Sequence, residues 1–261
     1  AYANRFDPQE LSPGLFGMAM DTEESLKEYL RLQLKVPLLG RIGPLARSLD
    51  FVANAAPGVK EILTVGKLAW EVREEHYDLV VVDAPATGHV VAQLAAPQAI
   101  NDLVKVGRVR DQTDWMVELL SDPATTGAVL VTTPEEMPVS ETIELTDRIR
   151  DETTVDLAAI VVNKVLPELF GRGEQEVFEQ LRAPEQVAVL ERTAGPAVNT
   201  VLDAAELAST LRRTSAEHIA RLRDDLAGTV PLLYVPFIFT RTHGVRATRN
   251  VAEALGAELG F

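Results

Sequence analysis

The chain has 261 residues, 46% of them hydrophobic, and no cysteine, which excludes disulfides, thiolate catalysis and cysteine-ligated zinc. Its 25 basic and 39 acidic side chains give a formal net charge of −14, which argues against nucleic acid as a partner because such binding needs clustered positive charge. No apolar run approaches the roughly 20 residues that cross a bilayer, and no signal peptide is recognised, so we expect a cytoplasmic protein.

The N-terminal part of the chain predicts one short strand and two helices. Residues 15–20 form an apolar run that is typical of a strand. Asp21, followed three residues later by Glu24, is typical of a helix start. Residues 57–76 carry the apolar stripe of a longer helix. Because the sequence enters this pattern abruptly at Ala1, we expect the chain to begin within a domain.

The next segment combines a predicted strand with a candidate for chemistry. Residues 79–82 (Leu-Val-Val-Val) form an unbroken apolar run, which is typical of a strand buried on both faces of a parallel sheet. Asp83 follows directly, and Pro85 and Gly88 open a loop. Ligands of open α/β sheets bind beyond the carboxyl ends of strands, where a carboxylate can hold a Mg²⁺-bound water. An aspartate that only caps a helix or a turn is the alternative.

Strands and helices alternate through the rest of the chain. A helical segment is predicted over 89–120, with interruptions at Pro97 and Gly107. Further strands are predicted at 128–132, 157–162 and 232–235, with helices between them and a last helix over 244–259. This alternation predicts an α/β fold, in which helices cover both faces of a mostly parallel sheet.

Two strand ends carry side chains that suit a nucleotide base. The Asn163 amide offers a donor and an acceptor, which match the edge of adenine. Guanine is disfavoured because Leu166 stands where guanine-reading motifs carry an aspartate. Pro236 and Phe237 follow the last strand and could sandwich a base. Purely structural roles are the alternative: the asparagine would close a turn, and the Pro-Phe pair would anchor the core.

Three segments, in this order, resemble the ArsA family of ATPases of arsenical pumps and tail-anchored-protein targeting. Residues 80–89 (Val-Val-Val-Asp-Ala-Pro-Ala-Thr-Gly-His) resemble its switch II, residues 129–142 its following strand, loop and helix, and residues 161–167 (Val-Val-Asn-Lys-Val-Leu-Pro) its adenine-contacting segment. The similarity is clearest over 77–168. Within the family, the chain most resembles the short, cysteine-free actinobacterial branch.

The resemblance implies a P-loop NTPase fold of the SIMIBI-like type, here incomplete at the N-terminus. Residues 1–261 would form a single ArsA-like ATPase domain that lacks its phosphate-loop unit, with 89–120 as a helical segment after switch II. Asp83 would be the catalytic residue, since it would help position Mg²⁺ through a water together with the attacking water. The implied cofactors are ATP and Mg²⁺, and the implied cofactor-binding residues are Thr87, Gly88, His89, Asn163, Pro236 and Phe237.

The chain departs from the family pattern in one respect that matters for activity. No Gly-x-x-x-x-Gly-Lys-[Ser/Thr] loop occurs in it, so the row of backbone N–H groups and the lysine that hold phosphates are missing. We expect the parent protein to carry this loop, and the switch I aspartate, upstream of Ala1, and this chain alone to be inactive. The alternative is a non-catalytic ArsA-like subunit or scaffold that partners an active ATPase.

The resemblance implies a dimer, either a homodimer or a heterodimer with another ArsA-like subunit. Without cysteine the chain has no thiolate site for arsenite and no zinc-bridged dimer. Only about 40 residues separate Gly88 from the next strand, fewer than in the tail-anchored-targeting members. The protein client is therefore open, and so is membrane contact. A DNA-partitioning ATPase is a third, weaker hypothesis, against which the acidic charge argues.

Overall fold

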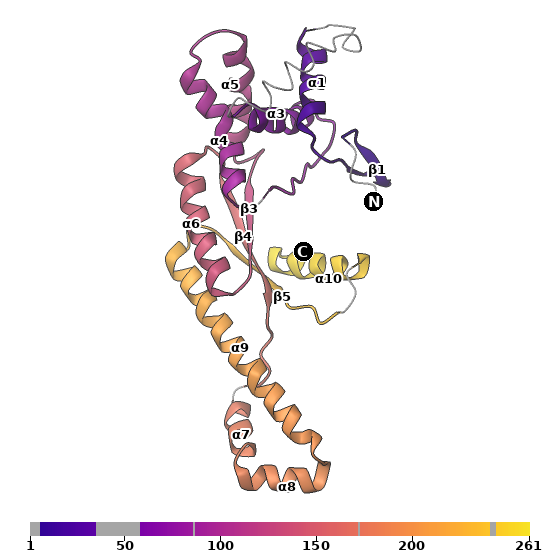
Figure 1. The fold of residues 1–261 in the computed structure, drawn as a ribbon, viewed down its shortest axis with the longest axis vertical. Helices are drawn as coiled ribbons and strands as arrows, with labels where there is room; N and C mark the ends of the chain where they lie inside the picture. Colours follow the sequence, from indigo (N-terminus) through magenta and orange to yellow (C-terminus); the bar gives the residue numbers. More distant parts are fainter. Residues whose placement is uncertain (1–5, 35–57, 86, 172, 241–243) are drawn as a thin grey trace. The chain divides into compact units, whose positions relative to one another are not determined.

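The computed structural model describes residues 6–34, 58–85, 87–171, 173–240 and 244–261 (Figure 1). The chain forms two compact units. The helical unit comprises Ala1–Gly127 and Arg148–Asp156, and the sheet unit comprises Ala128–Asp147 and Leu157–Phe261. The single domain expected over 1–261 stays a prediction.

The helical unit contains a small hairpin and four helices among its described residues. These elements are β1 (Gln9–Ser12), β2 (Leu15–Gly17), α1 (Thr22–Leu34), α3 (Val59–Arg73), α4 (Thr87–Leu103) and α5 (Arg108–Ser121). The strand predicted over 15–20 is shorter than expected, and it pairs antiparallel with β1. Gly14 explains this hairpin, because its φ of +76° lets the chain reverse between the two strands.

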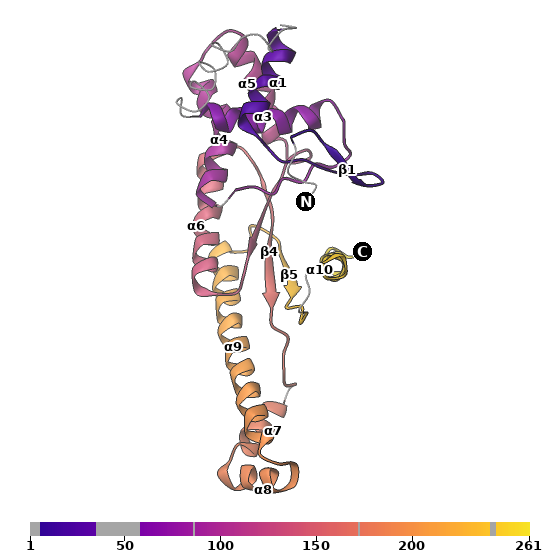
Figure 2. The same cartoon turned by 45° about the vertical axis from the view of Figure 1, so that its right-hand side comes forward.

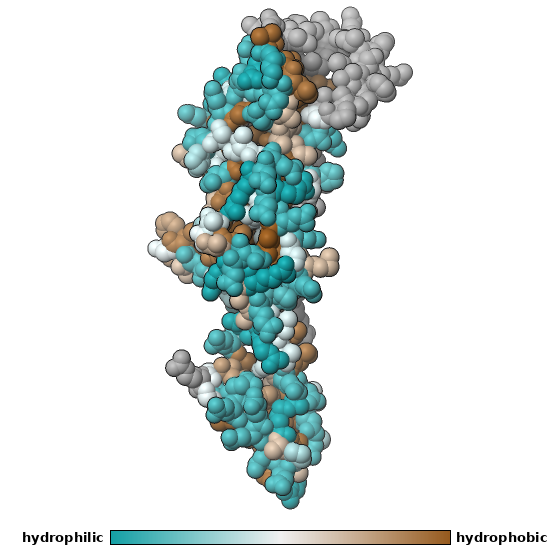
Figure 3. Space-filling model, turned by 90° about the vertical axis from the view of Figure 1, so that its left-hand side faces the viewer, coloured by the Kyte–Doolittle hydropathy of each residue, from teal (hydrophilic) through white to brown (hydrophobic). Residues whose placement is uncertain are grey.

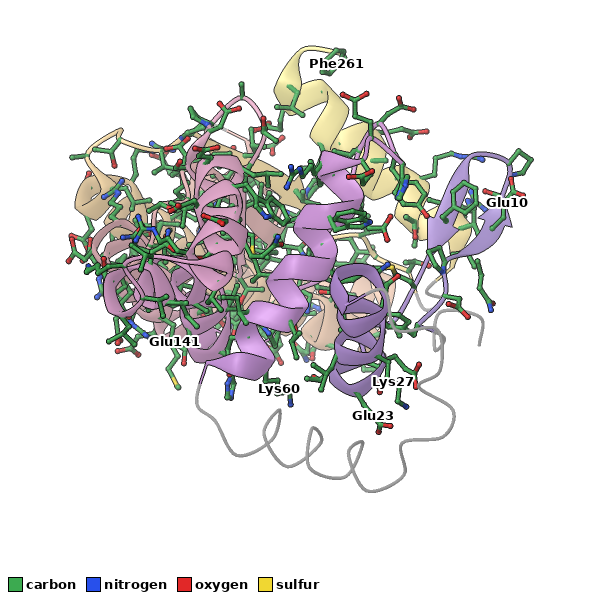
Figure 4. All side chains as sticks on the ribbon, turned by 90° about the horizontal axis from the view of Figure 1, so that it is seen from above. Glu10, Glu23, Lys27, Lys60, Glu141 and Phe261 are labelled. Atoms are coloured by element: carbon green, nitrogen blue, oxygen red, sulfur yellow. The ribbon has the colours of Figure 1, made fainter. Side chains whose placement is uncertain are left out.

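The start of α1 follows the prediction. The Asp21 carboxylate accepts a hydrogen bond of 2.9 Å from the backbone N–H of Glu24, which is the cap expected from the sequence. One turn further, Lys27 forms ion pairs with Glu23 and Glu24 on the surface of the helix, and Figure 4 shows Glu23 and Lys27 close together there. Exposed pairs of this kind contribute little to stability, so the cap is the feature that positions α1.

The helical segment after residue 86 consists of two helices. The break at Gly107 is confirmed, and its φ of +99° is a conformation that suits glycine. Pro97 does not interrupt the segment. It lies inside α4 and is fully buried there. A buried proline forfeits one helix hydrogen bond, and the packing of α4 against α3 and α5 compensates for that loss.

The strand predicted at residues 79–82 is wrong. This segment has no regular secondary structure, and the side chains of Leu79, Val81 and Val82 are 78%, 83% and 49% exposed. A strand exists only when its backbone N–H and C=O groups bond to a neighbouring strand. Among the described residues, no strand pairs with this segment. The apolar run alone therefore does not make it a strand.

The sheet unit is built on three parallel strands in the order β3-β4-β5. Its elements are β3 (Ala128–Thr132), α6 (Glu136–Glu152, whose last residues belong to the helical unit), β4 (Leu157–Val165), α7 (Glu174–Leu181), α8 (Pro184–Ala194), α9 (Ala197–Leu226), β5 (Leu232–Pro236) and α10 (Val245–Leu259). Figures 1 and 2 both show α6 and α9 on one side of the sheet and α10 on the other. The predicted α/β fold with a parallel sheet and helices on both faces is thereby confirmed.

The core of the sheet unit lies along β4. Ile160 and Val162 are fully buried, as are Val235 of β5 and Leu222 of α9. The α6 and α9 side, which Figure 3 turns toward the viewer, is largely hydrophilic, with hydrophobic residues between the polar ones. No described helix is long and apolar enough to span a membrane.

Candidate functional site

Asp83 and the predicted switch residues lie at the start of α4. Asp83 is exposed, and among the described residues no hydrogen bond or ion pair engages its carboxylate. Thr87, Gly88 and His89 form the first turn of α4, where Gly88 and His89 are exposed. Pro85 and Gly88 were expected to open a loop here, whereas in this structure Thr87, Gly88 and His89 are helical.

The first turn of α4 has the chemistry of an anion-binding element. The first N–H groups of a helix have no partner within the helix and lie at the positive end of its dipole. A Cβ added at Gly88 would meet no atom within 4 Å, so the backbone is open to a ligand there. A phosphate group is favoured at such a helix start. Asp83 lies four residues before Thr87, the first residue of α4.

The donor set of the helical unit is sparse for a metal ion. No group of three or more His, Cys, Asp or Glu side chains with metal-binding geometry occurs among the residues that the structure describes. Mg²⁺ commonly keeps several waters and takes one or two carboxylates together with substrate phosphates. The exposed carboxylate of Asp83 fits that role, whereas the described residues offer no metal cage made only of protein ligands.

Asn163 lies where β4 ends in an irregular register. The pairing with β5 shifts between Val162 and Val165, and Lys164 between them has a φ of +58°. The Lys164 backbone N–H donates a hydrogen bond of 2.8 Å to Asn163 Oδ1. This bond joins neighbouring residues within β4, so the amide group and the second lone pair of Oδ1 of Asn163 are still suited to a base edge.

Pro236 and Phe237 lie at the end of β5, next to the end of β4. Val165 pairs with Pro236, and the Phe237 N–H donates a hydrogen bond of 2.8 Å to the Val165 carbonyl. The Phe237 ring is 37% exposed and lies 4.8 Å, centroid to centroid, from the ring of Phe239. Three predicted base-binding residues thus meet at one end of the sheet, and Phe239 adds a second ring that the sequence analysis did not single out.

The predicted residues therefore fall into two groups. Asn163, Pro236 and Phe237 share one edge of the sheet unit, at the carboxyl ends of neighbouring parallel strands. The group from Asp83 to His89 belongs to the helical unit. The strand-end position of the first group is where ligands of open α/β sheets bind.

A buried ion network in the helical unit was missed by the sequence analysis. Lys67 Nζ lies 2.9 Å from Glu28 Oε1 and 2.5 Å from Glu71 Oε1, and His76 Nδ1 lies 2.6 Å from Glu71 Oε2. The side chains of Lys67 and Glu71 are only 7% and 6% exposed. The four-residue spacing of Lys67 and Glu71 was a usable signal. The contact with Glu28 bridges 39 residues and has no local signature.

The network shifts the ionisation of its two buried members. Burial alone would lower the pKa of Lys67, but its hydrogen bonds with Glu71 and Glu28 outweigh this and raise it. Burial alone would raise the pKa of Glu71, but hydrogen bonds with Lys67 and His76 lower it. Both groups therefore hold their charges at neutral pH.

The same helices enclose an apolar hollow of about 260 Å³ between α1, α3, α4 and α5. Its walls include Trp70, Trp115 and Met116, and Lys67 and Glu28 stand at its polar part. The guanidinium of Arg73 lies 4.8 Å from the centre of the Trp115 ring, a cation–π contact.

A family comparison decides the relationship. The model of the ArsA_ATPase family, described as anion-transporting ATPases, matches residues 5–118 and 103–193, which is more than half of the chain. The chain belongs to the ArsA ATPase family. The match includes Asp83 to His89 and Asn163 and ends before Pro236 and Phe237.

Individual relatives agree with this assignment of the chain to the ArsA family. The ATPase BagA of Mycobacterium tuberculosis is 31% identical over 156 residues, which cover 58% of this chain and 45% of the relative. A putative arsenical pump-driving ATPase of Halobacterium salinarum is 25% identical over 138 residues (50% of this chain, 21% of the relative). Another from Aquifex aeolicus is 26% identical over 191 residues (61% and 63%). The chain thus spans about half the length of the Mycobacterium relative.

Proposed function

We propose that the whole protein binds and hydrolyses ATP and works as a dimeric switch on a protein client. Membership of a family whose relatives are named ATPases is the observation that carries the ATPase activity. The exposed carboxylate of Asp83, four residues before α4, supports it. The dimer would consist of two copies of this protein or of this protein and another ArsA-like subunit, and the identity of the client is left to experiment.

In this proposal Asp83 positions the water molecules that take part in the hydrolysis of ATP. Mg²⁺, when bound with ATP, would neutralise the charge that develops on the phosphates. The Asp83 carboxylate would hold a water of that ion and accept a hydrogen bond from the attacking water. Thr87, Gly88 and His89 would bring backbone N–H groups to the phosphate side, and the first turn of α4 would change shape with the nucleotide.

The sheet unit would hold the base. Asn163 would donate through its amide group and accept on the free lone pair of Oδ1, matching the donor and acceptor of adenine. Pro236 and Phe237 would border the ring, and the exposed part of Phe237 offers a surface for stacking. The phosphate loop and the switch I aspartate would come from the parent protein, upstream of Ala1.

A non-catalytic ArsA-like subunit is the second candidate. No Gly-x-x-x-x-Gly-Lys-[Ser/Thr] sequence occurs within these 261 residues, and this observation favours it. Such a subunit would keep the fold and the dimer contacts and leave turnover to its partner. The two candidates differ in one measurable property, which is whether Asp83 matters for ATP turnover.

The test uses the whole protein and replaces Asp83 by Asn. We expect ATP turnover to fall by about a hundredfold or more, since a group that acts on the transition state is lost, while ATP binding and thermal unfolding change little. Asp78→Asn is the matched control, because Asp78 is also exposed and lies in the same segment. Turnover by Asp83→Asn equal to that of the control would refute the catalytic role and favour the non-catalytic subunit.

A further inference from the structure

A second hollow lies in the sheet unit, between the loop after β4, α7 and one face of α9. Its volume is about 220 Å³, and its polar and aromatic lining consists of Glu168, Phe170, Gln175, Ser209, Arg212 and Arg213. The last three share one face of α9, because they are spaced three and four residues apart. The hollow belongs to neither group of predicted site residues.

The walls of this hollow are held in place. The ring of Phe170 stacks on that of the buried Phe178, with centroids 4.6 Å apart and 30° between the planes. The Gly171 N–H donates a hydrogen bond of 2.6 Å to Glu174 Oε2, which ties the loop to the start of α7. The shape of the hollow is therefore largely formed before any ligand arrives.

Two polar atoms of α9 side chains that line the hollow have no hydrogen-bond partner among the described residues. Ser209 Oγ and Arg212 Nε are buried, and within the described part of the chain neither has a hydrogen-bond partner. Buried polar atoms are nearly always paired, and leaving one unpaired destabilises the protein. Such atoms on the wall of a hollow call for a hydrogen-bonding occupant, which is either water or a polar ligand.

The charges on the wall point to an anion. Two arginines of this unit form ion pairs: Arg182 pairs with Glu206 at 2.7 Å, and Arg221 pairs with Asp225 at 3.6 Å. Neither Arg212 nor Arg213 has an ion pair with a described carboxylate. Two arginines and one carboxylate, that of Glu168, therefore line this hollow, so its lining carries an excess of positive charge in a chain with a net charge of −14. Arginine is the preferred partner of phosphate groups.

We propose that this hollow binds a small phosphate ester, whose phosphate is held by Arg212 and Arg213. Ser209 and Gln175 would donate further hydrogen bonds to its oxygens. The Glu168 carboxylate can only accept hydrogen bonds, so it would receive one from a hydroxyl group of the ligand. The space far exceeds the roughly 30 Å³ of one water molecule, so it has room for a short carbon chain against Phe170.

The proposal is tested by calorimetric titration of the whole protein with glycerol 3-phosphate, inorganic phosphate and glycerol, each with and without saturating ATP. We expect glycerol 3-phosphate to bind more tightly than phosphate, and glycerol not to bind. Arg212→Gln and Arg213→Gln should each weaken binding about tenfold or more, because a hydrogen bond to a charged group is lost. Arg221→Gln is the control, since it removes the same charge from the same helix outside the hollow.

The opposite results are equally clear. Absence of binding at millimolar glycerol 3-phosphate would overturn the proposal. So would binding that Arg212→Gln and Arg213→Gln leave unchanged, or that Arg221→Gln weakens as much. Phosphate that binds as tightly as the ester would mean that the site takes a free anion and not an ester. Binding seen only without ATP would assign the ligand to the nucleotide site. None of these outcomes depends on turnover, so the proposed ATPase activity and this site can fail separately.

Discussion

Residues 79–82 and 159–162 have nearly the same apolar sequence, Leu-Val-Val-Val and Ala-Ile-Val-Val, but opposite surroundings. The second segment lies in β4, between β3 and β5, where Ile160 pairs with Leu130 on one side and Leu232 on the other. The first has no strand partner among the described residues, and Leu79, Val81 and Val82 are exposed. The comparison shows that an apolar run becomes a strand only when neighbours supply hydrogen bonds and cover its faces.

The two units also differ in what their cores contain. The core of the sheet unit consists of aliphatic side chains around Ile160, and these side chains have no titratable group. The helical unit includes the charged pair of Lys67 and Glu71 among its buried residues. The stability of the sheet unit should therefore fall when a buried side chain is shortened, and the stability of the helical unit should fall when a buried charge is removed.

The largest effect is expected from volume loss in β4. Ile160→Ala should destabilise the protein by about 4 kcal/mol, because Ile160 is fully buried and the change leaves a cavity. Val81→Ala removes similar atoms from a side chain that is 83% exposed and should change stability by less than about 0.5 kcal/mol. Urea unfolding measures both. Equal losses would mean that residues 79–82 are buried as originally predicted.

The next effect comes from removing the buried charge in the helical unit. Lys67→Met should cost about 3 kcal/mol, since Glu71 would remain buried without its lysine partner and keep only the half-exposed His76 from this network. Adding Glu71→Met should recover much of this loss, because the remaining pair is apolar and similar in volume. Thermal unfolding of the three proteins is the measurement. A double variant no more stable than Lys67→Met would show that the charges are not coupled.

The smallest effect concerns pH. Since the pKa of Glu71 is lowered in the folded state, its contribution is present above the unfolded carboxyl pKa and is lost as pH falls through the folded value. Lys67, whose pKa is raised, loses its contribution only as pH rises through the lysine range. Methyl NMR of Val65 and Ile160 between about pH 3 and 7 should show the helical unit loosening first. Glu71→Gln should remove that difference, and its persistence would contradict the assignment.

Sequence patterns predicted the sheet unit well and the helical unit less well. The strands β3, β4 and β5 lie within a few residues of their predicted ranges, because each apolar run has partners that satisfy it. The cap at Asp21 was predicted because it depends on residues only three positions apart. The helix expected over 57–76 is α3, which ends at Arg73, and position 57 lies outside the described residues.

The candidate sites also differ in whether local sequence patterns predict them. Asn163, Pro236 and Phe237 were predicted as strand-end residues, and the parallel pairing places them at one edge. The hollow that joins Phe170 to Arg212 depends on segments that are far apart in sequence, so no local pattern announces it. The network of Lys67 and Glu28 was missed for the same reason. Local patterns reveal caps and strand ends, whereas side chains that meet across elements are revealed by the fold.

The apolar hollow of the helical unit has a practical consequence. The chain contains two tryptophans, Trp70 and Trp115, and both line that hollow. Tryptophan fluorescence is therefore an optical reporter of the helical unit alone, while circular dichroism sums over both units. If the two signals change at different temperatures in one sample, the units melt independently. If they change together, folding is cooperative across the whole chain.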